Sequence, residues 1–325
     1  MDKSALIDIR GFGKRYGRTV AVRDVTLRVE RGQLYGLIGA DGAGKSSLMK
    51  AVAGVLSFDE GRLQVFGTAM DSERAAEPLK ARLGFMPQGL GLNLYPELSV
   101  EENVDFFARL RLVAPAALLA RKEKLLAMTR LAAFRSRPMK KLSGGMKQKL
   151  GLICTLIHAP ELIILDEPTT GVDPISRREF WDILSELHVD GVSILVSTPY
   201  MDEAERCSRV AMIYQGRLVV CDTPDRIKRL VQGDLVELRP LPADPAIPAG
   251  IGLLRRAEAI TAGLAGVLEV QTYGDLLHIF VDDSAERMPQ IETALTGQDI
   301  QVVGLRRAPA RMEEAFMSLI RAQEL

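Results

Sequence analysis

Apolar and polar side chains alternate along the first part of the chain. The segments "ALIDIRG" and "TVAVRDVTLRVE" place an apolar residue at nearly every second position. This spacing presents one face of a β-strand to a core. We therefore predict that the chain opens with two strands, each with one buried face.

Farther along, short runs of consecutive apolar residues replace this alternation, and helical patterns such as "SVEENVDFFARLRL" and "SRREFWDILSEL" lie between them. Buried strands that alternate with helices predict an α/β fold with a mainly parallel sheet and helices on its faces. The segment at about 90–145 is almost wholly helical in pattern and is predicted to be a helical insertion into that sheet. The predicted buried strands are "LYGLI", "LGFMP", "ELIILD", "VSILVS" and "VAMIY".

The pattern changes again near "DTPDRIKRL". The stretch "RPLPADPAIPAG" (Arg239–Gly250) contains four prolines and no periodicity, which predicts a loop or linker. The order of elements around it is strand, helix, two strands, helix and strand, with a closing helix at "RMEEAFMSLIRA". This order predicts a small ferredoxin-like α+β domain. We expect the larger domain at 1–230 and this accessory domain at 231–325.

The composition narrows the possible partners. Lys and Arg together number 42, as do Asp and Glu, so the chain has no overall electrostatic attraction to nucleic acid or to an anionic membrane. No apolar run approaches the ~18 residues that span a bilayer. We expect the protein to bind no nucleic acid, and if it serves a membrane, to do so from the cytoplasmic side through a partner. Cys154, Cys207 and Cys221 show no metal-ligand spacing and are expected to be reduced thiols.

A glycine-rich loop links the predicted strand "LYGLI" to a helix that begins near Lys45. The loop, "GADGAGKS" at 39–46, satisfies the pattern G-x-x-x-x-G-K-[ST], in which backbone N–H groups turn inward around phosphate oxygens. Lys45 would reach the β- and γ-phosphates of a nucleotide, and the Ser46 hydroxyl would bind Mg²⁺. The alternative is a glycine-rich turn that carries a lysine by chance. We expect nucleotide contacts from Gly39, Ala40, Asp41, Gly42, Ala43, Gly44, Lys45, Ser46 and Ser47.

Two adjacent carboxylates end another predicted strand. "LIILDEP" (Leu162–Pro168) is an apolar run that ends in Asp166 and Glu167. One carboxylate at a strand end is common and often only caps a turn. Two in succession suit a division of roles, in which Asp166 binds the metal and Glu167 polarises a water that attacks the γ-phosphate.

A third motif precedes "LIILDEP". In "KLSGGMKQKLGL" (Lys141–Leu152), Ser143, Gly144 and Gly145 stand at the start of an amphipathic helix. Ser143 could act only as the helix N-cap. The two adjacent glycines, with exposed backbone amides, suit a second phosphate-binding surface instead.

Taken together, these motifs resemble those of the ATP-binding-cassette (ABC) ATPases, whose signature reads LSGGQ. Gln88 in "LGFMPQ", "TTGVDP" (Thr169–Pro174) and Tyr16 in "FGKRYG" add to the match, which covers about 1–230. The resemblance implies an ABC-type P-loop ATPase domain with a mainly parallel core sheet, an antiparallel β subdomain and a helical insertion. It also implies ATP and Mg²⁺ as cofactors.

The resemblance also implies roles for single residues. Tyr16 would stack on adenine, and Glu167, Lys45 and Gln88 would be catalytic. Ser46, Gln88 and Asp166 would hold Mg²⁺. Ser143, Gly144 and Gly145 would bind the γ-phosphate held by a second cassette, and Asp173 would lie in the loop that crosses to that subunit. Two cassettes of this family face head-to-tail with two ATP molecules between them, so this chain must pair with its like or with a different cassette.

Two positions depart from the family's pattern. Pro199 follows the strand "VSILVST", where the family carries a histidine that donates to the γ-phosphate, and proline has no such donor. Met146 replaces the signature glutamine. We expect a site that binds Mg-ATP but hydrolyses it slowly, paired with a competent site on another cassette. Alternatively, a neighbouring polar group or water substitutes for the histidine.

The segments "YPELSVEENVDFFARLRL" and "STPYMDEAERC" resemble the ATPase subunits of bacterial multidrug, antibiotic and polysaccharide exporters. This resemblance implies a separate membrane permease as partner and a peripheral location on the cytoplasmic face of the membrane. Two alternatives remain, a soluble ABC ATPase acting on ribosomes or DNA and an ATP-sensing regulatory subunit. His278, in the accessory domain, is expected to be structural or solvent-facing.

Overall fold

The structure is a computed structural model that describes residues 5–89, 91, 93–231, 233–244, 246 and 250–324. The chain divides into two compact units, Met1–Pro224 and Asp225–Leu325. We describe each unit by itself. No helix among the described residues is long and apolar enough to cross a membrane.

The first unit contains the antiparallel sheet expected at the start of the chain. Strands β1 (Ala5–Tyr16) and β2 (Thr19–Glu30) pair with each other, and β1 also pairs with β4 (Glu60–Val65), which pairs with β5 (Thr68–Ala69). Alternate side chains of β2 are buried, including those of Val25, Leu27 and Val29. The period-two pattern is therefore confirmed as a sheet with one buried face.

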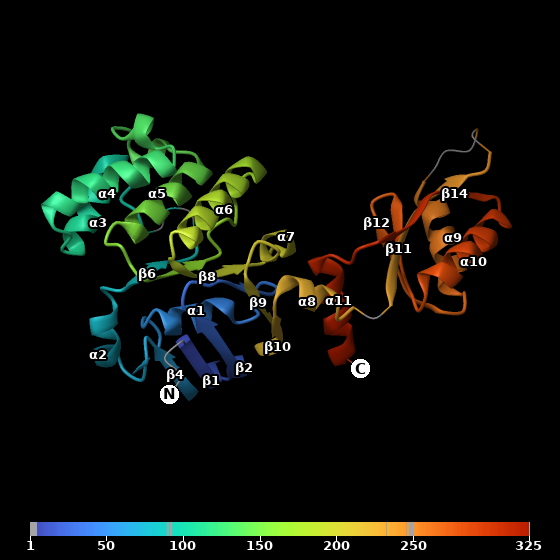
Figure 1. Ribbon diagram of the computed structural model, residues 1–325, viewed down its shortest axis with the longest axis horizontal. Helices are drawn as coiled ribbons and strands as arrows, with labels where there is room; N and C mark the ends of the chain where they lie inside the picture. The colour runs from blue at the N-terminus through green and yellow to red at the C-terminus, as the bar shows by residue number, and fades with distance from the viewer. Residues whose placement is uncertain are drawn as a thin grey trace. The chain divides into compact units, whose positions relative to one another are not determined.

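The second sheet has six strands in the order β10-β9-β3-β8-β7-β6. Strands β3, β6, β7, β8 and β9 run parallel, and β10 pairs antiparallel with β9. Figure 1 shows helices on both sides of this sheet, which explains why strands β3, β7 and β8 are buried at every position. The strands are β3 (Leu34–Ile38), β6 (Leu83–Met86), β7 (Leu162–Asp166), β8 (Ser193–Thr198), β9 (Arg209–Tyr214) and β10 (Arg217–Asp222).

The register of this sheet brings the ends of three strands to one edge. Ile38 pairs with Thr198, and Asp166 pairs with Ser197. The carboxyl ends of parallel strands are where ligands bind in open α/β sheets. The glycine-rich loop after β3, the acidic pair at the end of β7 and Pro199 after β8 therefore share this edge.

The predicted helical insertion is present as a set of helices that leads into α5. Ser99 caps the first long helix through a capping box, in which its hydroxyl accepts from Glu102 N and Glu102 accepts from Ser99 N. Such a box satisfies two of the free N–H groups of a helix start. The helices of the first unit are α1 (Lys45–Val52), α2 (Glu73–Ala76), α3 (Val100–Leu110), α4 (Pro115–Met128), α5 (Gly144–Leu156), α6 (Pro174–Val189) and α7 (Met201–Ala204), with short 3₁₀ turns at Glu77–Leu79, Ala132–Phe134 and Met139–Lys141.

The second unit begins with the short helix α8 (Pro224–Lys228), whose first residue closes the other unit, and has the ferredoxin-like order that the sequence predicted. Its four strands pair antiparallel in the order β12-β13-β11-β14. In Figure 1, α9 and α10 cover one face of this sheet and α11 lies on the other side. The elements are β11 (Asp234–Pro242), α9 (Ile251–Ala262), β12 (Val267–Tyr273), β13 (Leu276–Val281), α10 (Ser284–Thr296), β14 (Ile300–Ala308) and α11 (Met312–Glu324).

The predicted linker at Arg239–Gly250 is partly wrong. Arg239 to Pro242 form the second half of β11, where Pro240 pairs with Val302 and Pro242 with Ile300 of β14. The pairing of β11 with β13 ends at Leu238, so beyond that residue β11 is an edge strand. Proline is tolerated there because one side of an edge strand needs no N–H donor. Pro245 and 247–249 lie outside the described residues.

The three cysteines are free thiols, as expected. Cys154 and Cys207 are buried, and Cys221 is half-buried. Burial raises the pKa of the first two thiols above the ordinary value. The reactive thiolate form is therefore disfavoured at both positions.

Candidate functional site

The glycine-rich loop wraps around the ammonium group of its own lysine. Gly39 has φ +156°, and a Cβ there would lie 2.1 Å from the Ile213 carbonyl oxygen, so only glycine fits. Lys45 is 3% exposed. Its Nζ donates to the carbonyl oxygens of Gly39 at 2.8 Å and Ala40 at 3.1 Å. The loop therefore holds a buried positive charge at the start of α1.

The acidic pair at the end of β7 lies directly beside this lysine. Asp166 is fully buried, and its Oδ1 accepts from Ser46 Oγ at 3.0 Å and from Ser197 Oγ at 2.8 Å. Its Oδ2 is buried and has no hydrogen-bond partner. A buried carboxylate oxygen without a donor is costly unless a cation or other ligand completes it. This oxygen is the strongest indication in the site of a missing positive partner.

Glu167 is oriented by donors from three segments of the chain. Lys45 Nζ lies 3.0 Å from its Oε1, and Gln88 Nε2 donates to its Oε2 at 2.8 Å. Thr170 Oγ1 donates to the same oxygen at 3.3 Å. Glu167 also has φ +48°, a left-handed conformation that is uncommon outside glycine, and its N–H donates to Ser197 Oγ. The fold thus holds this carboxylate in a defined position.

The structure brings five of the predicted residues into one bonded cluster, here called the catalytic cluster: Lys45, Ser46, Gln88, Asp166 and Glu167. Tyr16, on β1, lies against Ser47, the residue after Ser46, with their hydroxyl oxygens 3.2 Å apart. The Tyr16 ring is half-exposed, and Lys14 Nζ lies 5.5 Å from its centroid. An exposed aromatic ring of this kind is free to stack on a base.

The signature residues stand apart from the catalytic cluster. Ser143 is exposed and caps α5, accepting from Met146 N at 3.3 Å. Gly145 packs against Ser176, where a Cβ would lie 2.4 Å from the Ser176 side chain. Among the described residues, no hydrogen bond or ion pair joins Ser143, Gly144 or Gly145 to the catalytic cluster. The exposed Ser143 hydroxyl is therefore accessible from outside the chain.

Asp173 caps α6, one helix beyond the acidic pair. Its side chain accepts from Ser176 N at 2.9 Å, and this hydrogen bond holds the pKa of the Asp173 carboxyl below its ordinary value. The residue is solvent-exposed. It therefore stays charged at the surface. Its partner Ser176 also packs against Gly145 at the start of α5.

Pro199 is half-buried and follows the last residue of β8. The side chains of its two neighbours, Thr198 and Tyr200, contact residues outside the catalytic cluster. Thr198 Oγ1 donates to Glu203 and accepts from Tyr200 N. The Arg177 guanidinium lies over the Tyr200 ring, 3.9 Å from its centroid. In these contacts, neither neighbour of Pro199 turns a donor toward the catalytic cluster.

Two residues that touch the catalytic cluster are absent from the sequence prediction. Ser197 binds both Asp166 and the Glu167 N–H, and Thr170 binds Glu167. Ser197 had a weak signal, since it is a hydroxyl near the end of an otherwise apolar run. Thr170 lies in the matched motif "TTGVDP", but the motif assigned it no role, because a threonine after a strand is common in any turn.

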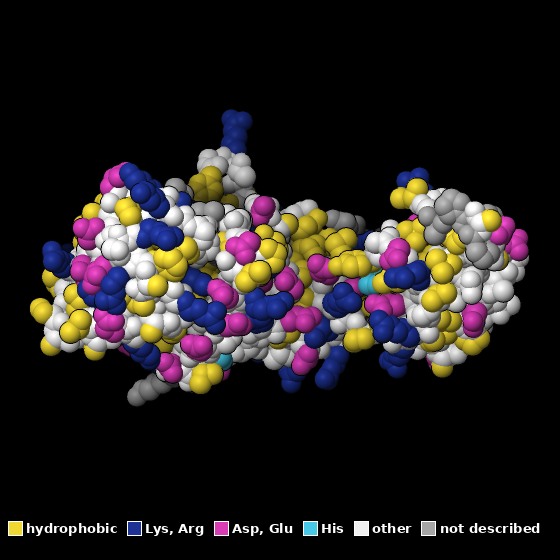
Figure 2. All heavy atoms as spheres, turned by 90° about the horizontal axis from the view of Figure 1, so that it is seen from above, with side chains coloured by type: hydrophobic (Ala, Val, Ile, Leu, Met, Phe, Trp, Pro, Cys, Tyr) yellow, Lys and Arg dark blue, Asp and Glu magenta, His cyan; other side chains and the backbone are white. Residues whose placement is uncertain are grey.

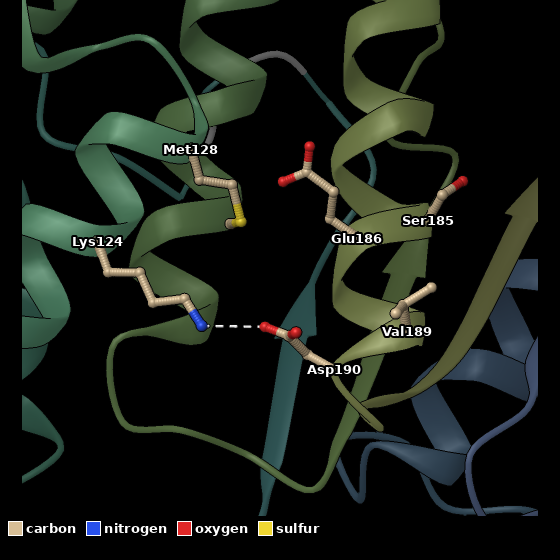
Figure 3. Close-up of a pocket in the computed structure, with 6 residues that line it drawn as sticks. All are labelled: Lys124, Met128, Ser185, Glu186, Val189 and Asp190. Atoms are coloured by element: carbon tan, nitrogen blue, oxygen red, sulfur yellow. Dashed lines mark hydrogen bonds and ion pairs between the residues drawn. The ribbon is translucent and has the colours of Figure 1, made fainter.

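A separate hollow of about 440 Å³ lies between α4 and α6. Figure 3 shows that Met128 and Glu186 face it and that Lys124 reaches Asp190, with Nζ and Oδ2 2.9 Å apart. Both partners of this ion pair are largely exposed. The hollow shares no residue with the catalytic cluster, and its exposed ion pair is of a kind that contributes little binding energy.

The chain was compared with known families and proteins. The family described as "ABC transporter" matches residues 22–170. The probable multidrug ABC transporter ATP-binding protein YbhF of Escherichia coli is 43% identical over 231 residues. That match covers 70% of this chain but 39% of YbhF, so the chain spans well under half of that relative.

Another relative matches along nearly its whole length. The daunorubicin resistance ATP-binding protein DrrA3 of Streptomyces coeruleorubidus is 34% identical over 316 residues, which cover 96% of this chain and 95% of DrrA3. Among solved structures, cbiO1 of Clostridium perfringens, part of the transporter complex cbiONQ, is 25% identical with a TM-score of 0.64. It covers 70% of this chain and 94% of its own.

Proposed function

This chain belongs to the family of ABC transporter ATP-binding proteins, and we propose that it is the ATP-binding subunit of an exporter whose membrane permease is a separate chain. The observation that carries the proposal is the catalytic cluster, in which Lys45, Asp166 and Glu167 converge at one sheet edge. The names of the relatives, multidrug and daunorubicin resistance, support export of a small organic compound. They give no support to a ribosome- or DNA-associated role.

The residues present fit a Mg²⁺ ion. Asp166 Oδ2 is buried without a partner, and the Ser46 hydroxyl already binds the other oxygen of the same carboxylate. Hard oxygen ligands of this kind, completed by phosphate oxygens and water, are typical of Mg²⁺ sites in nucleotide-dependent enzymes. We assign Ser46, Asp166 and Gln88 to the ion. When bound, it would neutralise charge on the phosphates.

The catalytic cluster accounts for hydrolysis by positioning and charge. A triphosphate seated at 39–46 brings anionic oxygens that compete for the ammonium protons of Lys45, which are now shared with Gly39, Ala40 and Glu167. Release from Lys45 would leave Glu167 free to accept a proton from water. Gln88 and Thr170 would keep it in place. Phosphoryl transfer depends mainly on such positioning and electrostatic stabilisation.

The exposed Ser143 requires a second cassette in this proposal. Its hydroxyl and the adjoining amides stand at a helix N-terminus, which favours an anion. Because no hydrogen bond or ion pair in the described part of the chain joins them to the catalytic cluster of their own chain, we assign to them the phosphate held by a partner cassette. A two-fold axis completes two such sites at once.

The surface that would receive the permease lies on the helical insertion. Tyr95 and Phe106 are part-exposed with ring centroids 4.5 Å apart, and Leu110 and Leu112 of the same region are largely exposed. An apolar group of this kind on a surface marks a protein contact. On the face drawn in Figure 2, basic and acidic side chains intermingle rather than gather into one field. We propose that the permease docks here, which places the chain at the cytoplasmic face of a membrane.

Pro199 makes the site slow in this proposal. Removing one preorganised donor from a developing anion costs about 10²–10³ in rate, and the neighbours of Pro199 are engaged with Glu203 and Arg177. The test is turnover of ATP by the purified full chain, with Pro199→His beside it. We expect Pro199→His to raise kcat by at least about tenfold, and Lys45→Ala to abolish hydrolysis.

Pro199→Ala is the matched control, because it removes the ring and restores the backbone N–H but adds no side-chain donor, which is what the histidine supplies. Its turnover should equal that of the wild type. Equal turnover of the wild type and Pro199→His would contradict the slow-site proposal. A wild-type chain that binds ATP tightly but never hydrolyses it, even beside its permease, would favour the ATP-sensing regulatory subunit, the second candidate that Pro199 supports.

A further inference from the structure

A buried carboxylate that is not among the predicted site residues joins three segments around the site. Glu203 lies on α7 and is 3% exposed. Thr169 Oγ1 donates to its two oxygens at 2.8 and 3.0 Å, and Thr198 Oγ1 donates to Oε2. Arg177 Nε donates to Oε1 at 3.1 Å. Three donor groups therefore converge on this one side chain.

Two partners of Glu203 adjoin the catalytic cluster, and the third lies on the neighbouring helix α6. Thr169 follows Glu167 by two residues. Thr198 follows Ser197, the residue that binds Asp166 and the Glu167 N–H. Arg177 stands in the first turns of α6, the helix that Asp173 caps. The carboxylate thus ties the loop after β7, the end of β8 and the surface segment at Asp173 into one unit.

We propose that Glu203 is a positioning residue for ATP hydrolysis. It touches no reacting atom. It fixes the loop that holds Glu167 in its left-handed conformation, φ +48°, and it anchors the strand end that precedes Pro199. Because position 199 supplies no donor, alignment of Glu167 depends on this backbone support. The inference rests on the proposed ATPase function and deepens it.

The negative charge of Glu203 is required for this role. Hydrogen bonds in which a partner is ionised are roughly twice as strong as neutral ones, and Arg177 supplies a positive partner that is mostly buried. Glu203→Gln keeps the shape and one acceptor oxygen but loses the charge. Misplacement of a catalytic group by a fraction of an ångström lowers turnover without removing the binding of the phosphates to the loop at 39–46.

The experiment measures kcat and the Kd for a fluorescent ATP analogue with the full chain. For Glu203→Gln we expect kcat to fall about tenfold and Kd to stay within about twofold. Asp202→Asn is the control, because Asp202 is an exposed carboxylate on the same Arg177, at 3.2 Å. It should leave both quantities within about twofold of the wild type.

Thr169→Val provides a second variant if Glu203→Gln does not fold. It removes one donor from the same carboxylate, and we expect kcat to fall about fivefold. Both changes remove the same interaction. The fall in kcat of the double variant should therefore be smaller than the product of the two single falls. A melting temperature within a few degrees of wild type separates positioning from unfolding.

The inference is overturned if Glu203→Gln and Thr169→Val fold and turn over ATP at the wild-type rate. It is also overturned if affinity falls in proportion to turnover, since that marks a defect in binding. Failure of the proposed function looks different, because the wild-type chain itself would then not hydrolyse ATP.

Discussion

The catalytic cluster of the first unit and the charged cluster of the second unit are both buried, yet they differ in what surrounds them. In the second unit, His278 is 1% exposed and lies between two buried carboxylates. Its Nε2 is 3.3 Å from Glu237 Oε1, and its Nδ1 is 3.2 Å from Glu314 Oε1. The Tyr273 ring stacks on it, with centroids 5.1 Å apart. We call these residues the His278 cluster.

The His278 cluster joins strands and a helix of the second unit, although His278 Nε2 has no hydrogen-bond partner. Glu237 stands in β11 opposite His278 in β13, and Arg306 of β14 donates to Glu237 at 2.8 Å. Glu314 belongs to α11, so its contact with His278 fixes that helix to the sheet. Val236 and Leu238, on either side of Glu237, face the core beneath α9 and α10. His278 is therefore structural, and the solvent-facing alternative is wrong.

The comparison of these two clusters shows that a buried charged side chain does not by itself indicate a ligand-binding site. The catalytic cluster lies at the carboxyl ends of parallel strands, beside a loop whose glycines bring backbone close, and Asp166 Oδ2 faces no donor. The His278 cluster lies in mid-strand under a helix. Strand ends leave room for a ligand, whereas mid-strand positions are filled by the neighbouring layer.

The strongest test of this comparison is Glu167→Gln. Removing the group that accepts the proton should lower kcat by about 10²–10³, while ATP remains bound through the loop at 39–46. Turnover and nucleotide binding are measured on the same preparation. Glu161→Gln is the control, since Glu161 is an exposed carboxylate just before the other end of β7. Equal losses from both changes would contradict the assignment of Glu167.

His278→Leu should act on stability rather than on turnover. It leaves Glu237 and Glu314 buried without the imidazole, and breaking one partner from a buried charged cluster costs about 3 kcal/mol. Hydrogen exchange of β13 and α11 should rise, with ATP turnover unchanged. Asp275→Asn, which removes an exposed ion pair with Arg239 in the same sheet, should cost under about 0.5 kcal/mol. Slow exchange of α11 in His278→Leu would show that other contacts hold this helix.

The smallest effect concerns acid stability at the edge of the parallel sheet opposite the site. Hydrogen bonds from Arg82 and then Arg31 lower the pKa of Glu161 from its ordinary 4.5 to about 2. A lowered pKa means that the ion pairs stabilise the fold above about pH 4.5 and lose their effect as the pH falls toward 2. Because Glu161 is part-exposed, Glu161→Gln should cost under about 1 kcal/mol at pH 7.

The measurement is urea unfolding of both chains from pH 7 to pH 3. The difference in unfolding free energy between wild type and Glu161→Gln should shrink steadily below pH 4.5. A difference that stays constant through this range would show that Arg82 and Arg31 do not act through the charge of Glu161.

Much of the fold follows from patterns along the chain, and the failures have physical reasons. The glycine-rich loop, the strand ending in Asp166 and the strand-helix order of the second unit are local patterns, and the structure confirms each. The second half of β11 escaped prediction because Pro240 and Pro242 lack the alternation of a strand. Their place on an edge, which permits prolines, depends on where β13 stops.

By itself, the sequence determined most of the elements, the glycine-rich loop at 39–46 and the family, because periodicity, glycine spacing and motif order are properties of short segments. Only the tertiary structure decided which donors surround Glu167 and Asp166, since Gln88, Ser197 and Lys45 come from separate strands and loops that the sheet register aligns. It also decided that Glu203 is buried at a crossing of three segments and that His278 anchors a helix. A charged residue on the surface and one in the core are the same residue type in the sequence. Only the packing of the folded chain shows which of them is buried.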